Sequence, residues 1–257
     1  MSAQEDAEPV LDQRGFSAGY RGVAVVHDID LHVGAGEVVA LLGPNGAGKT
    51  TTLLAASGLL PRLGGTARIL GADQPPGRRR QVTKLALALR RRGLAHVPED
   101  RALFFGLTGR EHLRLAAARG DSEAIEQALA PFPALAKIID RKAGLMSGGE
   151  QQMLALARAL AGRPKLLMVD ELSLGLAPLV IAQLLPLVRT VARELGVGVL
   201  LVEQHPHAAL SIADRAYMML GGCIGYAGTA AALAADTERL AATYLGANPG
   251  PSGDPSD

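Results

Sequence analysis

An eight-residue glycine-rich string, GPNGAGKT at residues 43–50, constrains the fold of this chain more than any other feature. It follows a short apolar run, Val38–Leu42, and leads into a helix-favouring segment at residues 49–57. A glycine-rich turn placed between a buried strand and a helix is the setting in which a phosphate-binding loop works. The string therefore predicts a strand–loop–helix unit that binds the phosphates of a nucleoside triphosphate.

Each residue type in this loop has a physical task. Its three glycines allow backbone conformations closed to residues with a Cβ, so that successive N–H groups can point at phosphate oxygens. The positive end of the following helix dipole adds to that field. We expect Lys49 to reach the β- and γ-phosphates, the Thr50 hydroxyl to ligate Mg²⁺, and Thr51 to bond near the α-phosphate. The full set of expected nucleotide contacts here is Gly43, Pro44, Asn45, Gly46, Ala47, Gly48, Lys49, Thr50 and Thr51.

A second apolar run, residues 166–169, ends in two adjacent carboxylates, Asp170 and Glu171. Ligands bind at the carboxyl ends of strands in open α/β sheets, so carboxylates there lie close to a phosphate loop. We expect Asp170 to hold Mg²⁺, through water, and Glu171 to act on the attacking water as a general base. The alternative is a solvated acidic pair at a strand end.

The three apolar runs of the chain are short, rich in Val and Leu, and do not alternate with polar residues: 38–42, 166–169 and 199–202. That pattern is typical of strands buried on both faces of a parallel sheet. A helix-favouring segment follows each run, at residues 49–57, 179–195 and 206–212. Strand-then-helix repetition predicts an α/β layered core. With 3% aromatic residues and no Trp, that core must be aliphatic.

The segment from about residue 107 to 160 favours helices and shows no clear strand. We interpret it as an inserted helical subdomain, with Asp121 or Ser122 capping one helix and Gly162 with Pro164 ending the last. A single domain is then expected at 10–247, with its core at about 10–95 and 158–247 and its helical insert at about 96–157. The ends, 1–9 and 248–257, are expected to be disordered tails.

Inside this segment, Ser147 precedes Glu150 by three residues at the start of a helical run, the pattern of a capping box. A cap requires no glycines between its two residues, yet Gly148 and Gly149 stand there. Glycines at a helix N-terminus suit the close approach of a phosphate from another molecule.

Taken together, GPNGAGKT, MSGGEQQ at residues 146–152 and LLMVDE at residues 166–171 resemble the ATP-binding subunits of ABC transporters, over nearly all of 10–246. The resemblance implies a P-loop NTPase core, mainly a parallel sheet flanked by helices, with an antiparallel N-terminal β part. It implies ATP and Mg²⁺ as cofactors. It also implies that Ser147, Gly148 and Gly149 close over the ATP held by a second ATPase subunit, different or identical, in a head-to-tail dimer.

Further site residues follow from the same resemblance. Tyr20 looks like the aromatic residue that stacks on adenine, although an ordinary strand tyrosine is the alternative. Glu99 occupies a position where most members carry Gln, between the γ-phosphate site and the membrane partner, and is counted with Thr50 and Asp170 among the metal candidates. Gln204 stands where most members have a γ-phosphate-sensing His, and His205 follows it; both remain candidates, with Gln204 favoured by position.

Departures from the common pattern narrow the family. Leu172 replaces a common Pro, and Ala177 replaces the usual Asp of the next loop. With the strings VPE, SLGLAP and VEQ, they resemble the second ATPase of high-affinity branched-chain amino-acid importers. An importer of urea or amides is the first alternative, and a soluble non-transport ABC ATPase a less favoured one. A P-loop kinase should lack SGGEQQ.

The implied partners are two membrane permease subunits and, indirectly, an extracytoplasmic solute-binding protein. With a net charge of +1, no global field recruits nucleic acid, so none is expected. No run approaches the ~20 apolar residues of a membrane span, so any membrane role requires a partner. The resemblance implies a peripheral subunit at the cytoplasmic face of the cell membrane. A basic cluster at residues 78–92 fits anionic lipid or nucleic acid, but a solvated face is favoured. The lone Cys223 is expected in the core.

Overall fold

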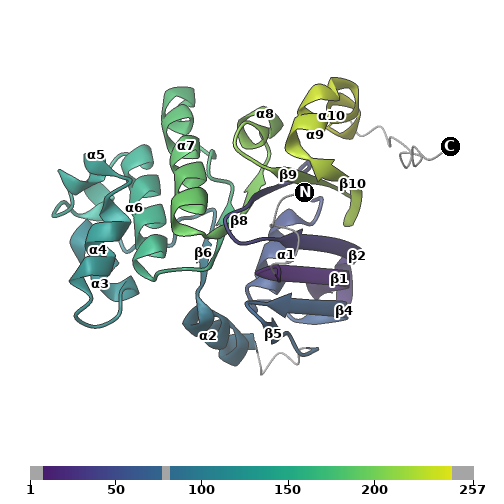
Figure 1. The fold of residues 1–257 in the computed structure, drawn as a ribbon, viewed down its shortest axis with the longest axis horizontal. Helices are drawn as coiled ribbons and strands as arrows, with labels where there is room; N and C mark the ends of the chain where they lie inside the picture. Colours follow the sequence, from purple (N-terminus) through teal and green to yellow (C-terminus); the bar gives the residue numbers. More distant parts are fainter. Residues whose placement is uncertain (1–7, 77–81, 245–257) are drawn as a thin grey trace.

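Two β-sheets organise the molecule, which is described here from a computed structural model covering residues 8–76 and 82–244 (Figure 1). The first is antiparallel, in the order β2-β1-β4-β5, and its strands are β1 (Leu11–Tyr20), β2 (Val23–Val33), β4 (Arg62–Ile69) and β5 (Ala72–Asp73). The second has the order β10-β9-β3-β8-β7-β6, and its strands are β3 (Val38–Leu42), β6 (Leu94–Val97), β7 (Leu166–Asp170), β8 (Gly198–Glu203), β9 (Arg215–Leu220) and β10 (Cys223–Thr229). All neighbours in the second sheet are parallel except β9 and β10. The predicted mainly parallel sheet with an antiparallel N-terminal part is confirmed.

Helices cover the six-stranded sheet, and Figure 1 shows one group of them, α3 to α6, on the side away from β1, β2 and β4. The helices are α1 (Lys49–Ala56), α2 (Val82–Arg92), α3 (Gly109–Ala116), α4 (Ser122–Leu129), α5 (Pro133–Ala136), the short 3₁₀ helix η2 (Ala143–Leu145), α6 (Gly148–Ala161), α7 (Pro178–Leu195), α8 (Pro206–Leu210), α9 (Ala230–Ala235) and α10 (Thr237–Tyr244). None of the helices in the described residues is both long and apolar enough to cross a membrane.

The central strands are apolar throughout because both of their faces are buried. In β3, alternate side chains point to opposite faces. Val38, Ala40 and Leu42 join one hydrophobic cluster with helices α3 to α7, whereas Val39 and Leu41 join a second cluster with α1 and the antiparallel sheet. The strand therefore reads as a continuous apolar run instead of an alternating one.

Several helix ends differ from the sequence-based expectation. The helix α6 begins at Gly148 because Ser147 caps it, and it ends at Ala161, with Gly162 as its C-cap as expected. The helix α7 begins one residue earlier than expected, at Pro178, and α8 begins at Pro206 as expected but ends two residues early, at Leu210. In both, proline stands at the first position, where its missing N–H is not needed. Asp121, one of two candidates, caps α4 through a bond from the backbone N–H of Ala124 to its carboxylate (2.9 Å).

One expectation about the core is wrong: Cys223, the first residue of β10, is exposed. It lies at an edge strand, whose side chains alternate between exposed and half-buried along its length. Of the basic cluster, Lys84 and the arginines at 90–92 are exposed on α2. Arg78, Arg79 and Arg80 lie outside the described residues, as do residues 1–7 of the first expected tail (1–9) and all of the second (248–257).

The helical segment between β6 and β7 packs as part of the main body. Leu113 of α3, Leu135 of α5 and Leu154 of α6 belong to the same hydrophobic cluster as Leu167 and Val169 of β7. The division of residues 10–247 into a core and an insert stays a prediction. What the fold fixes is that α6 is packed, through this cluster, against the sheet that carries the phosphate loop.

Candidate nucleotide site

An open cavity of about 480 Å³ lies over the loop between β3 and α1. Its walls come from the carboxyl ends of β3, β6, β7 and β8, together with β2. The residues that line it are Val25, Asn45, Gly46, Gly48, Lys49, Thr50, Thr51, Glu99, Glu171, Leu174 and Gln204. Nine of these eleven belong to the predicted site, so the fold brings together strings that are far apart in sequence.

Glycine is required in the loop by its backbone. Gly43, Gly46 and Gly48 have φ angles of 148°, 78° and 105°, in the region that residues with a Cβ rarely adopt. A Cβ on Gly43 would lie 2.4 Å from the carbonyl oxygen of Met219 on the neighbouring strand. The conformational freedom predicted for these three glycines is confirmed.

Lys49, the first residue of α1, is nearly buried, with 5% of its surface exposed. Its ammonium donates to the carbonyl oxygens of Gly43 (2.8 Å) and Pro44 (3.1 Å). Burial lowers the pKa of Lys49, while the carboxylates of Glu171 and Asp170 oppose that shift. The loop thus holds a cation at the floor of the cavity, where a phosphate group would need one.

Asp170, the last residue of β7, is 2% exposed, and its Oδ1 has no hydrogen-bond partner among the described residues. Burial raises the pKa of this carboxyl to about 6, and the neighbouring Glu171 and Glu99 add to the shift. A buried carboxylate oxygen without a partner is costly unless a cation binds it. It therefore fits a hard cation such as Mg²⁺, which prefers oxygen ligands.

No group of three or more His, Cys, Asp or Glu side chains suited to a metal occurs in the described part of the chain. Mg²⁺ is commonly held by one or two carboxylates together with substrate phosphates and water. The arrangement of Asp170 below the cavity, with Thr50 and Glu99 lining it, matches that kind of site and not a metal cage made by protein alone.

Glu171 has a φ angle of 50°, in the left-handed region. This conformation is less favourable by roughly 1–2 kcal/mol for a residue with a Cβ. Its backbone N–H donates to the carbonyl of Val202 (2.9 Å), and its Oε1 accepts a hydrogen bond from Gln204 Nε2 (2.6 Å). Strained residues cluster at functional sites because the surrounding structure holds them there. Gln204 lines the cavity, whereas His205 is exposed and does not.

Besides His205, four of the predicted residues outside the phosphate loop and β7 do not line the cavity. Tyr20 is 47% exposed at the end of β1, opposite Val23 and near the part of β2 that lines the cavity. Ser147, Gly148 and Gly149 form the start of α6 and are not among the residues lining this cavity.

The capping box predicted at this helix start is confirmed. Glu150 Oε2 accepts from the backbone N–H of Ser147 (2.7 Å), and Ser147 Oγ accepts from that of Glu150 (3.4 Å). Packing supplies a further reason for glycine here, since a Cβ on Gly149 would lie 2.7 Å from Val180 Cγ1 on α7. Sequence reasoning had explained this glycine only by the approach of a phosphate.

Sequence reasoning missed a buried pair beside the site. Glu203, at the carboxyl end of β8, accepts two hydrogen bonds from Ser173, which follows Glu171 closely. The signal was available, because Glu203 ends an apolar run in the same way that Asp170 does. It also missed Arg101, whose Nε donates to Gln152 Oε1 (2.7 Å) and so ties the segment after Glu99 to α6.

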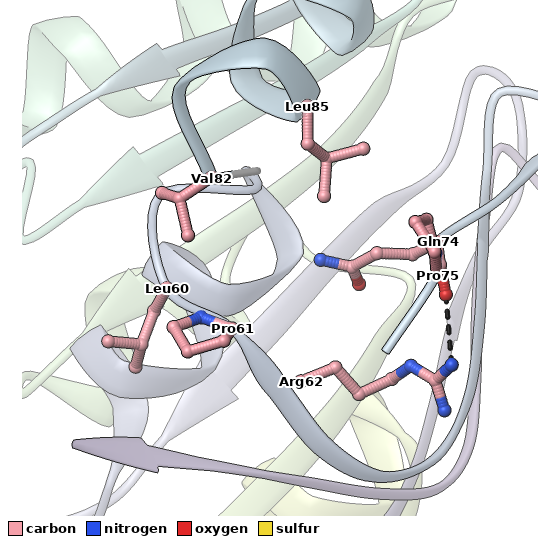
Figure 2. Close-up of a pocket in the computed structure, with 7 residues that line it drawn as sticks. All are labelled: Leu60, Pro61, Arg62, Gln74, Pro75, Val82 and Leu85. Carbon is pink, nitrogen blue, oxygen red and sulfur yellow. Dashed lines mark hydrogen bonds between the residues drawn. The ribbon is translucent and has the colours of Figure 1, made fainter. Parts of the chain in front are cut away.

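A second cavity of about 20 Å³ lies beyond the far end of α1, lined by Leu60, Pro61, Arg62, Gln74, Pro75, Val82 and Leu85 (Figure 2). Gln74 Nε2 donates to the carbonyl of Ala55 (2.8 Å), and Arg62 Nη2 donates to the carbonyl of Gln74 (3.0 Å). A volume of this size holds about one water molecule. It is a packing void, and the larger cavity is the candidate nucleotide site.

A family model described as "ABC transporter" matches residues 26–173. The chain is 39% identical to the high-affinity branched-chain amino acid transport ATP-binding protein of Pseudomonas aeruginosa, over 90% of this chain and 97% of that protein. It is 36% identical to a probable branched-chain amino acid transport ATP-binding protein of Archaeoglobus fulgidus, over 84% and 90%. It is also 31% identical to the lipopolysaccharide export system ATP-binding protein of Escherichia coli, over 92% and 97%.

Solved structures give the same answer for the fold. A structure titled as the ATP-binding subunit of an ABC transporter superposes with a TM-score of 0.73 at 28% identity, covering 94% of this chain and 95% of that one. An ATP-binding cassette captured as a dimer after hydrolysis, with ADP and phosphate bound, superposes with a TM-score of 0.70 at 22% identity, covering 86% and 98%. At that identity, the second likeness concerns the fold alone.

Proposed function

This chain belongs to the ABC transporter family, and from that premise we propose that it drives the import of branched-chain or other hydrophobic amino acids. As a member of this family it is an ATP-binding subunit and an ATPase. The ATPase chemistry is carried by the convergence of Lys49, Thr50, Glu99, Glu171 and Gln204 on one cavity over the phosphate loop. The solute class is supported by the two amino-acid transport relatives.

The residues divide the chemistry of hydrolysis among them. Backbone N–H groups of the loop and the Lys49 ammonium bind the phosphates of ATP. Thr50 and Asp170, with Glu99 nearby, would hold Mg²⁺, which supplies charge neutralisation on the phosphates when bound. Glu171 accepts a proton from the attacking water. Gln204, bonded to Glu171, orients that carboxylate and faces the same cavity.

The helix start at Ser147, Gly148 and Gly149 is proposed to serve a second ATPase subunit. It presents free N–H groups and the positive end of the α6 dipole, which suit a phosphate. Because these residues do not line their own chain's cavity, a head-to-tail pair in which each subunit completes the other's site accounts for them. The remaining partners proposed are two membrane permease subunits, at the cytoplasmic face of the membrane, and an extracytoplasmic solute-binding protein.

Uptake in cells tests the solute class. A strain lacking this chain is given labelled leucine, urea and a short amide, and is complemented with the wild-type chain or with Lys49→Ala. We expect leucine uptake to return with the wild-type chain only, because Lys49 is the cation at the cavity floor. Urea or amide uptake in its place would assign the chain to the related importers. Full uptake with Lys49→Ala would mean that the partner subunit's ATP site suffices alone.

An export role is the second candidate, favoured by the 31% identity to the lipopolysaccharide export protein. The ATP site described above serves import and export equally, since it contains no solute-binding residue. The uptake assay separates the two, because a strain lacking an exporter subunit keeps its normal uptake of all three solutes.

A further inference from the structure

We propose that Glu203 is a positioning residue, which holds the loop after Glu171 in the shape that keeps the Glu171 carboxylate in place. The proposal rests on the function assigned above, in which Glu171 is the general base. It adds a residue that neither touches ATP nor lines the cavity. Its action is exerted through Ser173.

The contact between the two side chains is close and fully buried. Glu203 is 1% exposed and Ser173 is 5% exposed. Glu203 Oε1 accepts from the backbone N–H of Ser173 (2.9 Å), and its Oε2 accepts from the Ser173 hydroxyl (2.6 Å). Both carboxylate oxygens thus bind one residue, and the two bonds fix both the backbone and the side-chain rotamer of Ser173.

A carboxylate at this position is expensive for folding. Burial raises the pKa of Glu203, and the two hydrogen bonds from Ser173 oppose the shift. Glu203 forms no ion pair with the described residues. An apolar side chain would suit a strand whose other residues are Gly, Val and Leu, and would avoid the cost of burying a charge. The bonds to Ser173 are what the carboxylate provides and an apolar residue cannot.

Three consecutive residues at the end of β8 hold the chain just after β7. The Val202 carbonyl accepts the N–H of Glu171, Glu203 accepts both donors of Ser173, and Gln204 donates to the Glu171 side chain. Glu171 itself has the left-handed φ of 50°, which persists only where neighbouring contacts determine it. Glu203 supplies the contacts on the far side of Glu171, at Ser173.

Removing Glu203 leaves the phosphate loop intact but frees the loop at Ser173. Glu171 can then leave its strained conformation, and its carboxylate moves relative to the attacking water. A misplacement of about 1 Å can lower turnover about a hundredfold. ATP affinity depends on the loop at residues 43–51 and is expected to change little.

The first test is steady-state ATP hydrolysis by the full chain in its assembled transporter. For Glu203→Ala we expect kcat to fall about tenfold to a hundredfold, with KM for ATP within about twofold of the wild type. Glu203→Gln, which can accept the Ser173 N–H and donate to its hydroxyl, should restore kcat to within about threefold. Ser173→Ala should lower kcat. The double variant with Glu203→Ala and Ser173→Ala should be no slower than Glu203→Ala alone, because Glu203→Ala already removes the interaction between the two side chains.

The control is Asp214, an exposed carboxylate whose Oδ2 accepts the backbone N–H of Val38 (2.9 Å) at the other end of β3 and which pairs with Arg189. Asp214→Asn should lower thermal stability and leave kcat within about twofold. An unchanged kcat in Glu203→Ala would overturn the proposal. So would equal losses of kcat in Glu203→Ala and Asp214→Asn, or a double variant slowed by the product of the two single effects.

Hydrogen exchange separates this proposal from the assignment of function. In the free full chain, the Ser173 amide should exchange at least tenfold faster in Glu203→Ala than in the wild type, with Glu203→Gln close to the wild type. Wild-type protein that fails to hydrolyse Mg-ATP would contradict the proposed function. Unchanged exchange at Ser173 in Glu203→Ala would contradict only the positioning role of Glu203.

Discussion

At the scale of single residues, the site is a set of polar groups whose burial or strain makes the free energy of folding less favourable. Glu171 is strained, Asp170 is buried without a full set of partners, and Lys49 has its ammonium at a buried position. Neither the strain at Glu171 nor the burial of these two charged groups stabilises the fold by itself. Residues that are unfavourable locally are found where function requires them.

Gln204→Ala should slow hydrolysis without loss of ATP binding. It removes the 2.6 Å hydrogen bond to Glu171 Oε1 and leaves the phosphate loop untouched. We expect kcat to fall about tenfold, as for loss of one oriented hydrogen bond at a reacting group, with KM for ATP unchanged. His205→Ala is the paired variant, since His205 is exposed beside it. A loss of turnover confined to His205→Ala would reverse the assignment between the two.

Asp170→Asn should make the metal-free protein more stable at neutral pH while abolishing hydrolysis. The folded state raises the Asp170 pKa from 3.8 to about 6, so it binds more protons than the unfolded state between those values. Ionisation therefore destabilises the fold increasingly as pH rises through about 4 to 6, by on the order of 3 kcal/mol above that window. Asn carries no such charge.

Urea unfolding of both proteins in a chelator checks this prediction. The stability advantage of Asp170→Asn should be present at pH 7.5, shrink as the pH falls from about 6 to 4, and be lost below that window, where the wild-type carboxyl is protonated in both states. Equal stabilities at pH 7.5 would show that the buried carboxylate costs nothing in the folded protein.

At the scale of elements, α6 connects the nucleotide cavity to the helix start that is proposed to contact a partner's ATP. Its N-terminus presents Ser147 to the surface, and its middle is tied by Gln152 to Arg101, just after Glu99 of the cavity wall. Arg158 of α6 donates to the carbonyl of Arg101 (3.0 Å). The helix is thereby attached at two points to the segment that leaves the nucleotide cavity.

Ser147→Ala should lower both stability and turnover, because Ser147 caps α6 and is proposed to contact the partner's ATP. The chain offers a matched control in α3, where Thr108 and Glu111 form the same kind of capping box. Each change to Ala should lower the free energy of unfolding by about 1 kcal/mol. Only Ser147→Ala should also reduce ATP turnover in the assembled transporter. Equal effects of both on turnover would reduce Ser147 to a helix cap.

At the scale of the whole molecule, each chain carries the phosphate loop on one surface and the α6 N-terminus elsewhere, outside its own cavity. We propose that a second subunit turned head-to-tail completes this surface, as in the closed symmetry that governs most protein pairs.

Glu171→Gln should make this association visible. The variant retains the loop that binds ATP but lacks the base, so ATP and Mg²⁺ should accumulate in an unreacted pair. We expect the mass measured by light scattering to double with ATP and Mg²⁺ if the partner is a second copy, and to stay monomeric with ADP. Adding Lys49→Ala to the variant should prevent doubling. A monomer under every condition would mean that the partner is a different ATPase subunit.

The sequence by itself determined the main strands and the phosphate loop, because the patterns that specify them are local. A glycine-rich turn, a strand ending in two carboxylates and a capping box each depend on neighbouring residues, so the strands at β3, β7 and β8 and the loop at residues 43–50 could be predicted. Helix ends differed by a few residues where a proline or cap set them. Cys223 was misplaced because exposure at an edge strand depends on sheet order, which no local pattern carries.

Only the tertiary structure decided how those pieces meet. Parallel pairing of β7 with β8 puts Glu203 beside Ser173 and Gln204 beside Glu171, across about thirty residues of sequence. Tertiary packing also places Val180 against Gly149, where a Cβ would collide with the Val180 side chain, and so supplies a second physical reason for glycine at this position. The glycine-rich string specifies a place for phosphate because backbone conformation is a local property. The groups that position its general base are contacts between strands, and these exist only once the sheet has formed.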